Sequence, residues 1–207
     1  MTNQAKSFKG EVHAVQCDVT KEEDVLRVIQ WTRDNLGGVD VLVNNAGIGY
    51  RSPLTGIDTE QMRHTIDVNV FGLCVFTREV VKDMRDRGVN DGHIFHISSV
   101  SGQRIMDIPG SYLYGSTKHA VRVLTEGLRR ELRDLKTQIR VTGISPGLVR
   151  TEIAEAAGMS KEQAEKYYEA KPHLQSKDVA EALLYALATP PHVQVHELTI
   201  LPIGQLG

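Results

Sequence analysis

Short apolar runs alternate with longer segments of helical periodicity along the chain. Val39–Asn44 is almost continuously apolar, a pattern that favours a parallel strand covered on both faces. Other short runs are rich in β-branched residues and predict further strands. These runs are Val12–Val19, His93–Ser98, Ile139–Ile144 and Glu197–Leu201.

Longer segments with apolar residues three and four positions apart predict helices between the strands. The first helix should run from Lys21 to about Asn35, with Thr20 as its N-cap and Gly37–Gly38 after its end. The other helices are expected at Thr59 to about Arg87, at Tyr112 to about Leu135, and from Ser176, as cap, to Ala188. We expect a break near Asp67–Asn69 in the longest of them.

Strand and helix alternate five times, which is typical of an α/β fold with right-handed crossovers. We therefore predict a Rossmann-like, doubly wound parallel sheet. In such sheets ligands bind outside the carboxyl ends of the strands. The residues that directly follow the predicted strands are Asp18, Asn44–Gly49, Ser98–Gly102 and Ser145–Thr151.

Composition narrows the class of protein without identifying it. The 207 residues are 41% hydrophobic and 24% charged, which suits one globular domain over residues 1–207. The formal net charge of −2 gives no electrostatic reason to bind nucleic acid or an anionic membrane. Cys17 and Cys74 lack CxxC spacing, and neither a signal peptide nor a bilayer-spanning segment is visible. We therefore expect a cytoplasmic protein with reduced cysteines.

Tyr114 and Lys118 are the strongest catalytic candidates. Residues at i and i+4 share a helix face, so the phenol and the ammonium group point the same way. A nearby cation should pull the phenol pKa down from about 10 toward neutral pH, where a tyrosine can work as a general acid or base. The same spacing often arises by chance, so it needs support from other residues.

Other catalytic patterns are weak. His93 and His96 are three positions apart on a predicted strand and face opposite sides, which argues against a shared metal site. His96 is better explained as a hydrogen-bonded core residue. The sequence contains no Walker A motif, which argues against a P-loop enzyme. We expect no bound metal.

Support for the Tyr–Lys pair comes from a series of motifs. In chain order they are CDVT (17–20), NNAG (44–47), VNVFG (68–72), ISSVSG (97–102), YGSTK (114–118) and SPGLVRT (145–151). Together they resemble the short-chain dehydrogenase/reductase family from about Glu11 onward. DGHIFHISSVSGQR and LTEGLRRELRDLKTQIR are most similar to the branch that holds dehydrogenase/reductase SDR family member eleven and insect farnesol dehydrogenases.

The resemblance implies four catalytic roles. Tyr114 would give or take the proton of the carbonyl or alcohol oxygen, and Lys118 would lower its pKa and hold the nicotinamide ribose. Ser99 would donate a hydrogen bond to the substrate oxygen. Ser101 remains an alternative to Ser99, because its spacing to Tyr114 also occurs in the family. Asn69 would hold a water that links Lys118 to solvent.

The resemblance also implies a nicotinamide cofactor, NADP in this branch, with NAD not excluded. Asp18 and Val19 would lie at the adenine. The remaining cofactor contacts would be made by Asn45, Ala46 and Gly47 along the adenine ribose, and by Tyr114, Lys118, Pro146, Gly147, Val149 and Thr151 at the nicotinamide end. Thr151–Leu174 matches the family's substrate lid.

One family feature is missing from the sequence, the glycine-rich TGxxxGIG turn that holds the pyrophosphate at a helix N-terminus. Gly47 and Gly49 belong to the NNAG motif and do not replace it. In family terms the chain starts just before the third strand and lacks the first βαβ unit, so we expect an N-terminally truncated form. Val12–Val19 would then either move beside Val39–Asn44 or lose its partner.

Two functions follow from these expectations. The first is an oxidoreductase that transfers a hydride between NADP(H) and a small-molecule alcohol or ketone, such as a steroid or an isoprenoid. The second is a catalytically impaired chain that associates with the full-length enzyme. Family oligomers pair the helices that correspond to Val68–Arg87 and Tyr112–Leu135, so we expect a homodimer or homotetramer. An epimerase of the extended family is less favoured, because no added substrate domain is visible.

Overall fold

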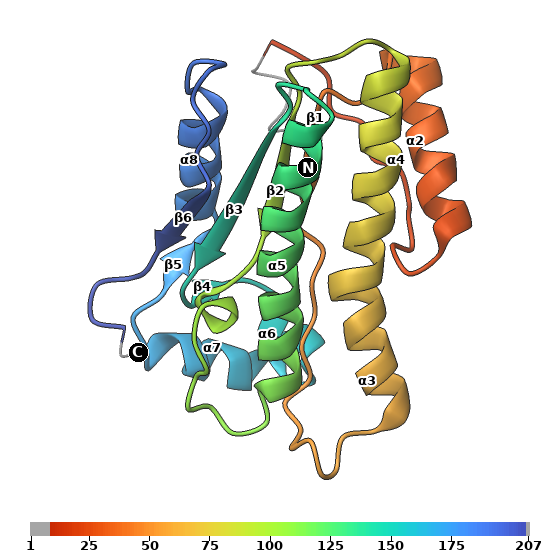
Figure 1. The fold of residues 1–207 in the computed structure, drawn as a ribbon. Coiled ribbons are helices and arrows are strands. Elements are labelled where there is room, and N and C mark those ends of the chain that lie inside the picture. Colours follow the sequence, from red (N-terminus) through yellow and green to blue (C-terminus); the bar gives the residue numbers. More distant parts are fainter. Residues whose placement is uncertain (1–8, 206–207) are drawn as a thin grey trace.

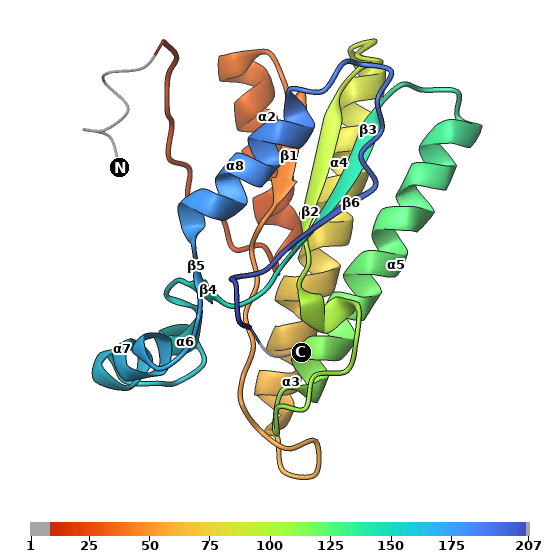
Figure 2. The same cartoon turned by 90° about the vertical axis from the view of Figure 1, so that its left-hand side faces the viewer.

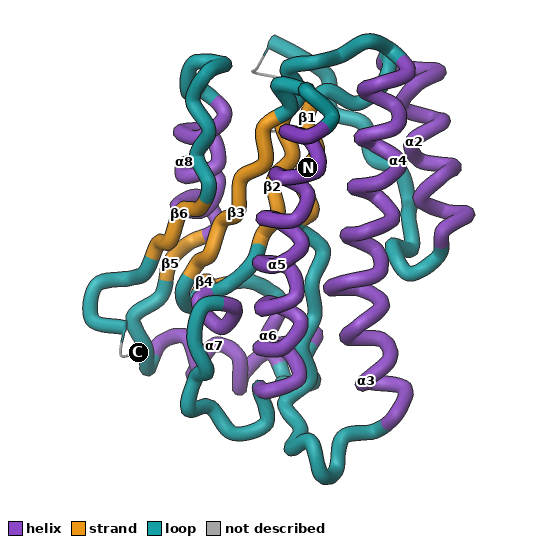
Figure 3. Tube along the Cα trace, viewed as in Figure 1, coloured by secondary structure: helices purple, strands orange, loops and turns teal. Residues whose placement is uncertain are grey.

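Four parallel strands form the centre of the structure, a computed structural model that describes residues 9–205 (Figures 1 and 3). The strands are β1 (Val41–Asn44), β2 (His93–Ile97), β3 (Arg140–Pro146) and β6 (Glu197–Ile200). They lie in the order β1-β2-β3-β6. In this register Ile94 lies between Leu42 and Val141, so one apolar row crosses three strands.

Helices cover both faces of this sheet (Figure 2). The helices α4 (Leu73–Asp86) and α5 (Tyr112–Asp134) pack on one face, and α8 (Ser176–Leu187) packs on the other. The helix α2 (Glu22–Leu36) packs against α4. This arrangement confirms the predicted Rossmann-like, doubly wound α/β class.

Two apolar clusters fill the layers on either side of the sheet. On the α4 side, Val25 of α2 and Met84 of α4 are fully buried together with Ile94 of β2. On the α8 side, Phe95 and Ala186 are fully buried against each other. Alternate residues of β2 thus serve opposite layers, as a central strand requires.

The remaining elements lie near the carboxyl ends of the strands. The helix α3 (Thr59–Ile66) precedes α4, and a small parallel pair is formed by β4 (Val149–Arg150) and β5 (Leu174–Gln175). Along the chain, α6 (Ile153–Ala156) and α7 (Lys161–Glu169) come between β4 and β5, and they occupy the predicted lid segment. No helix in the described part of the chain is long and apolar enough to cross a lipid bilayer.

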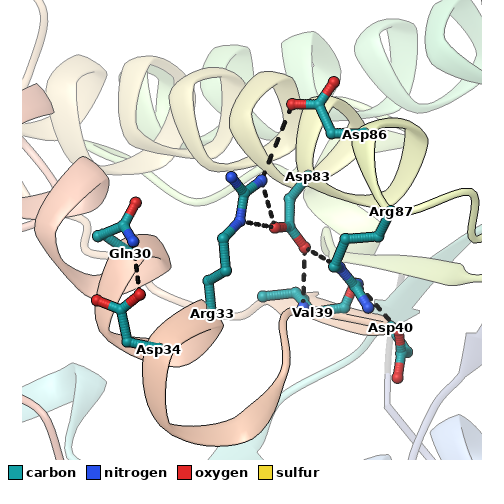
Figure 4. A network of polar contacts seen from close by, with 8 residues as sticks. All are labelled: Gln30, Arg33, Asp34, Val39, Asp40, Asp83, Asp86 and Arg87. Carbon is teal, nitrogen blue, oxygen red and sulfur yellow. Dashed lines mark hydrogen bonds and ion pairs between the residues drawn. The ribbon is translucent and has the colours of Figure 1, made fainter.

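A buried carboxylate, Asp83, ties α2, α4 and the start of β1 together (Figure 4). Its side chain is 1% exposed and accepts hydrogen bonds from the side chains of Arg33 at 2.8 Å and Arg87 at 2.8 Å. It also accepts the backbone N–H of Val39 at 3.0 Å. Burial pushes the pKa of Asp83 upward, but the hydrogen bonds from Val39, Arg33 and Arg87 outweigh it and hold the pKa below its ordinary value.

Val12–Val19 does not form the expected strand, so that prediction was wrong, and of the two outcomes expected for the segment it has no strand partner rather than lying beside β1. The segment runs as a loop into α2 (Figure 3), and Val12 is 60% exposed. Its backbone is held by local contacts instead: Asp24 accepts the N–H of Asp18, and Arg27 donates to the carbonyl of Gln16. A strand forms only by hydrogen bonding to a neighbouring strand, and β1 does not pair with this segment.

Both predicted helix caps were also wrong by one residue. The N-cap of α2 is Lys21, since the Thr20 hydroxyl donates to Asp18 instead of capping the helix. The N-cap of α8 is Gln175, which forms a reciprocal capping box with Asp178. The predicted end of α2 was right, because Gly37 adopts a left-handed φ of 85° there.

β1 is covered on one face only, contrary to the expectation from its apolar run. Val41 and Val43 are 42% and 40% exposed on the side of the sheet where α8 lies. Leu42 points to the opposite side and packs into the α4 layer. A continuous apolar run therefore marks where a strand can be buried, and the covering elements decide whether it is.

His96 sits in a buried chain of polar groups behind β2, as the sequence suggested for a core histidine. Asn44 donates to the Thr77 hydroxyl at 3.0 Å, and that hydroxyl lies 3.2 Å from Nε2 of His96. Nδ1 of His96 lies 2.9 Å from the Thr125 hydroxyl, which itself donates to a carbonyl. These directions assign the proton to Nδ1 and keep the ring neutral. Burial accordingly lowers the pKa of His96 from 6.5 to about 4.

This histidine should make the fold sensitive to mild acid. Between pH 6.5 and 4 the unfolded chain binds a proton at His96 and the folded chain does not, so stability falls as pH falls. The loss should reach on the order of 3 kcal/mol. Urea unfolding of wild type and His96→Gln at pH 7 and pH 4.5 measures it, because a glutamine side chain does not titrate. Equal pH dependence in the two proteins would contradict this account.

Candidate active site

The predicted catalytic residues meet where the carboxyl ends of β1 and β2 face the first turns of α5. Tyr114 and Lys118 come from α5, Ser99 follows β2, and Asn69 comes from the segment between α3 and α4. Lys118, Asn69 and Ser99 are 4%, 1% and 9% exposed. Side chains from three segments that are far apart in sequence are thus gathered in one largely buried polar site.

Asn69 reaches this site through a local distortion of its helix. Residues Asp67–Gly72 form a π-helical turn between α3 and α4, at the position where the sequence predicted a break. The Asn69 amide donates to the carbonyl of Ile48 at 2.8 Å and accepts its N–H at 2.9 Å. It also donates to the Thr117 hydroxyl at 3.0 Å. Asn69 therefore fixes the loop after β1 against α5.

Lys118 is a buried ammonium group held by a backbone carbonyl. Its Nζ donates to the carbonyl of Ile97 at 2.9 Å and lies 5.7 Å from the centre of the Tyr114 ring. Burial lowers the pKa of Lys118 from 10.5 to about 8. The group remains largely protonated at neutral pH and loses its proton readily in mild alkali.

Tyr114 differs electrostatically from the sequence-based expectation. Burial raises the pKa of its phenol above 10, and the hydrogen bond with the Ser99 side chain only partly offsets this. The expected lowering by Lys118 does not outweigh burial, because the ammonium group is directed to the carbonyl of Ile97. Tyr114 therefore carries its proton at neutral pH.

The three neighbouring serines have different surroundings. Ser98 donates to the carbonyl of Lys118 at 3.1 Å, which binds the strand end to α5. The Ser99 hydroxyl accepts the N–H of Ser101 at 3.1 Å, and its side chain lies close enough to Tyr114 to lower the phenol pKa in part. Ser101 thus supports Ser99 through its backbone. The geometry places Ser99, among these serines, beside the phenol.

Two glycines after β1 leave room for these side chains. A Cβ at Gly47 would lie 3.4 Å from Nζ of Lys118, and a Cβ at Gly49 would lie 2.7 Å from Cδ2 of Tyr114. A side chain at Gly49 would therefore force Tyr114 to move. The close approach of the loop to Tyr114 therefore favours glycine at position 49, whereas a Cβ at Gly47 would make only an ordinary contact with Lys118.

A small cavity lies beside β1, where the sequence predicted the adenine end of a nucleotide. Its volume is about 190 Å³, and Val19, Asn45 and Ala46 are part of its lining. Asp18 directly precedes Val19 in the chain, and its carboxylate accepts hydrogen bonds from the backbone N–H and the hydroxyl of Thr20. A Cβ at Gly72 would come within 2.6 Å of the carbonyl of Val19, so this loop packs closely on α4. The cavity is lined mainly by apolar residues, with Asn44 and Asn45 as its polar ones.

The other predicted cofactor residues lie at the end of β3. Pro146 ends the strand, and the N–H of Gly147 donates to the carbonyl of Ile200 at 2.7 Å. Val149 is in β4, and the carbonyl of Thr151 accepts the Tyr168 hydroxyl of α7 at 3.0 Å. The segment therefore joins the sheet to the predicted lid. In residues 9–205 no cluster of side chains could hold a metal ion.

Thr117 is a site residue that the sequence did not single out. It is 3% exposed, and its hydroxyl accepts from Asn69 and donates to the carbonyl of Tyr114 at 2.7 Å. Its place inside the YGSTK motif, one position before Lys118, was the only available signal.

The buried Lys118 should lower the stability of the fold. The lowering of its pKa from 10.5 to about 8 corresponds to a destabilisation of the folded state by about 3 kcal/mol. Replacing Lys118 removes this destabilisation but also removes its hydrogen bond to Ile97, which contributes about 1 kcal/mol. We therefore expect Lys118→Met to raise the free energy of unfolding by about 2 kcal/mol at pH 7. The gain should shrink as pH rises from 8 toward 10.5, where wild-type Lys118 is neutral when folded. Urea titrations at pH 7 and pH 9.5 check this, and a destabilised variant at pH 7 would refute it.

Comparison with known sequences gives consistent matches over the chain. A family model described as short chain dehydrogenase matches residues 1–162. A farnesol dehydrogenase of Aedes aegypti is 48% identical over 204 residues, which are 98% of this chain and 80% of that protein. Human dehydrogenase/reductase SDR family member 11 is 40% identical over 200 residues, which are 96% of this chain and 77% of that protein.

Solved structures agree with the fold. The closed form of a serine dehydrogenase complexed with NADP⁺ matches with a TM-score of 0.88 and 32% identity, covering 99% of this chain and 82% of that chain. An alcohol dehydrogenase from Thermococcus sibiricus, complexed with 5-hydroxy-NADP, matches with a TM-score of 0.77 and 29% identity, covering 92% and 74%.

Proposed function

The chain belongs to the short chain dehydrogenase family, and from that premise we propose that it transfers a hydride between NADP(H) and an alcohol or ketone, with Tyr114 as general acid or base. The observation that carries this proposal is the Tyr114 ring 5.7 Å from the buried Lys118 ammonium group, with Ser99 close enough to affect the phenol pKa.

The proton chemistry follows from the state of Tyr114. With its pKa raised by burial, the phenol is protonated at neutral pH and can donate to a carbonyl oxygen as hydride reaches the carbonyl carbon. In the reverse direction the phenolate accepts the proton of the alcohol. The Ser99 hydroxyl orients the same oxygen, and Asn69 would hold the water that reprotonates the site through Lys118. The protonated phenol suits carbonyl reduction at neutral pH.

We expect two parts of the chain to hold the two ends of a nicotinamide cofactor, while the glycine-rich turn that holds the pyrophosphate in the family is not in the sequence. Val19, Asn45 and Ala46 line the cavity for the adenosine end, with Asp18 and Gly47 next to them. The nicotinamide end would be surrounded by Tyr114, Lys118, Pro146, Gly147, Val149 and Thr151. When bound, the cofactor supplies or takes up the hydride. NADP is favoured because the two solved structures above contain NADP⁺ or a derivative.

The substrate class is proposed from the relatives. The 48% identical relative is named farnesol dehydrogenase, so a lipophilic isoprenoid alcohol is the first candidate, followed by steroids and similar ketones. The lid helices α6 and α7 would cover such a substrate, since Tyr168 already anchors α7 to Thr151.

A homodimer or homotetramer would form through the outer faces of α4 and α5. A groove of about 790 Å³ lies between these helices, and Leu73, Val81 and Leu128 are part of its lining. Val123 on the same surface is 72% exposed. Apolar side chains along two neighbouring helix faces fit a second copy of the same surface.

The proposal is tested with the purified chain, NADPH or NADH, and a panel of isoprenoid, steroid and short aliphatic ketones and alcohols. We expect saturable NADPH binding by nicotinamide fluorescence, weaker NADH binding, and turnover with lipophilic substrates. Absence of any nicotinamide binding would refute the function for this chain. Binding without turnover on any substrate would leave Tyr114 without its proposed role.

A further inference from the structure

The carboxylate of Glu197, at the start of β6, bonds to three different elements around the site. Its Oε1 accepts the Gln103 side-chain amide at 2.6 Å and the Ser145 hydroxyl at 2.8 Å. Its Oε2 lies 3.4 Å from Nε of Arg122. The Glu197 side chain is 27% exposed, and Ser145 is fully buried. A partly buried carboxylate with donors on both oxygens is a strong anchor.

Gln103 connects Glu197 to the turn that carries Ser99. Val100–Gly102 form a single 3₁₀ turn directly after Ser99, and Gln103 ends that turn with its N–H on the carbonyl of Val100. The Gln103 side chain also donates to the Thr199 hydroxyl at 2.6 Å. The turn is therefore bonded to β6 at its far end, four residues from Ser99.

Arg122 connects Glu197 to the helix that carries Tyr114. Tyr114, Lys118 and Arg122 are spaced four apart, so they share one face of α5. Ser145 adds the end of β3, immediately before Pro146 and Gly147. Glu197 thus contacts the elements that deliver the serine, the tyrosine and the predicted nicotinamide segment.

We propose that Glu197 is a positioning residue, whose carboxylate holds the Ser99 turn and α5 in register so that the Ser99 hydroxyl meets the Tyr114 phenol. The proposal rests on the oxidoreductase function proposed above. Glu197 does not touch the reacting atoms and acts through Gln103 and Arg122. Without the carboxylate, the turn keeps its internal hydrogen bonds, its packing of Gly102 against the carbonyl of Lys118 on α5, and the contact of Gln103 with Thr199.

The experiment compares wild type with Glu197→Ala, with Gln103→Glu, and with the double variant Glu197→Gln/Gln103→Glu, which exchanges donor and acceptor. Glu181→Gln is the control, because Glu181 is 63% exposed on α8 and lies 3.6 Å from the ammonium group of Lys177. The rate of amide hydrogen exchange at Ser101, Gly102 and Gln103 measures how firmly the turn is held, and it needs no cofactor. Steady-state kinetics with the cofactor measure the effect on catalysis.

We expect Glu197→Ala to speed exchange of these three amides about tenfold and to leave the amides of α2 unchanged. We expect kcat to fall about tenfold to a hundredfold with the KM for NADPH unchanged. Gln103→Glu should act similarly, since two carboxylates would then face each other. The double variant should restore slow exchange and much of kcat, and Glu181→Gln should match wild type.

Unchanged exchange at the turn in a folded Glu197→Ala protein would overturn the proposal. If Glu197→Ala does not fold, Gln103→Glu and the double variant decide, because rescue of the first by the second requires a direct contact. If wild type shows no hydride transfer, the proposed function fails on its own, and the exchange data still determine whether Glu197 holds the Ser99 turn.

Discussion

Tyr114→Phe should lower kcat by about 10²–10⁴-fold, because it removes the proton donor and leaves the ring in place. The phenylalanine keeps the apolar contacts of the ring, so the loop at Gly49 and the packing of α5 should be unchanged. NADPH binding should stay within a few-fold of wild type, since the hydroxyl contributes to the proton transfer rather than to the adenosine end. The measurement is kcat and KM for both substrates, together with the Kd for NADPH.

Tyr112→Phe is the matched control for this variant. Tyr112 begins the same helix, two residues earlier, and is 47% exposed. Its hydroxyl has no place in the proposed chemistry, so kcat should be close to that of wild type. Retention of more than a tenth of wild-type kcat in Tyr114→Phe would remove Tyr114 from the mechanism.

Asp83→Asn should lower the free energy of unfolding by about 3–5 kcal/mol, the usual cost of breaking a buried ion pair from one side. The side chain is 1% exposed and receives three donors, from Val39, Arg33 and Arg87 (Figure 4). An amide keeps the shape but lacks the charge, and its NH₂ group would face one of the arginines. Urea unfolding at pH 7 measures the loss.

The control for Asp83→Asn is Asp86→Asn on the same helix. Asp86 is 55% exposed and reaches Arg33 only at 3.9 Å, so its replacement should cost about 1 kcal/mol or less. The change in the pH dependence of stability should also be larger for Asp83→Asn than for Asp86→Asn. The pKa of Asp83 is lowered on folding, so its contribution is present above the unfolded pKa and is lost as pH falls below about 4. Equal stability of the two variants would show that the cluster is not a structural anchor.

Much of the fold could be predicted from periodicity, because β2, α4 and α5 form where their own hydrophobic patterns predict a strand and two helices. Val12–Val19 shows the limit of that approach. Its residues favour a strand, but a strand also requires a partner, and no local pattern reports which strand lies next to which. The predicted cap at Thr20 failed for a related reason, because its hydroxyl donates to Asp18 and a search for capping residues does not consider such a competing acceptor.

The sequence predicted which side chains lie close together in the candidate site, but not their electrostatics. The spacing of Tyr114 and Lys118 located both groups, but it suggested a lowered phenol pKa. Burial and the direction of the ammonium group, which reverse that expectation, are properties of the folded protein. Glu197 was missed altogether, because its partners Gln103 and Ser145 lie 94 and 52 residues away in sequence.

The most direct test of the central claim is transfer of deuterium from farnesol labelled at its carbinol carbon to NADP⁺ by the purified chain. Mass spectrometry of the cofactor reads out the transfer, and it detects even a single turnover. We expect NADPH that carries one deuterium, formed together with the aldehyde, and no labelled cofactor with Tyr114→Phe. Unlabelled cofactor and unchanged alcohol, in the presence of bound NADP⁺ and across the same substrate panel, would contradict the assignment of this chain as a working oxidoreductase.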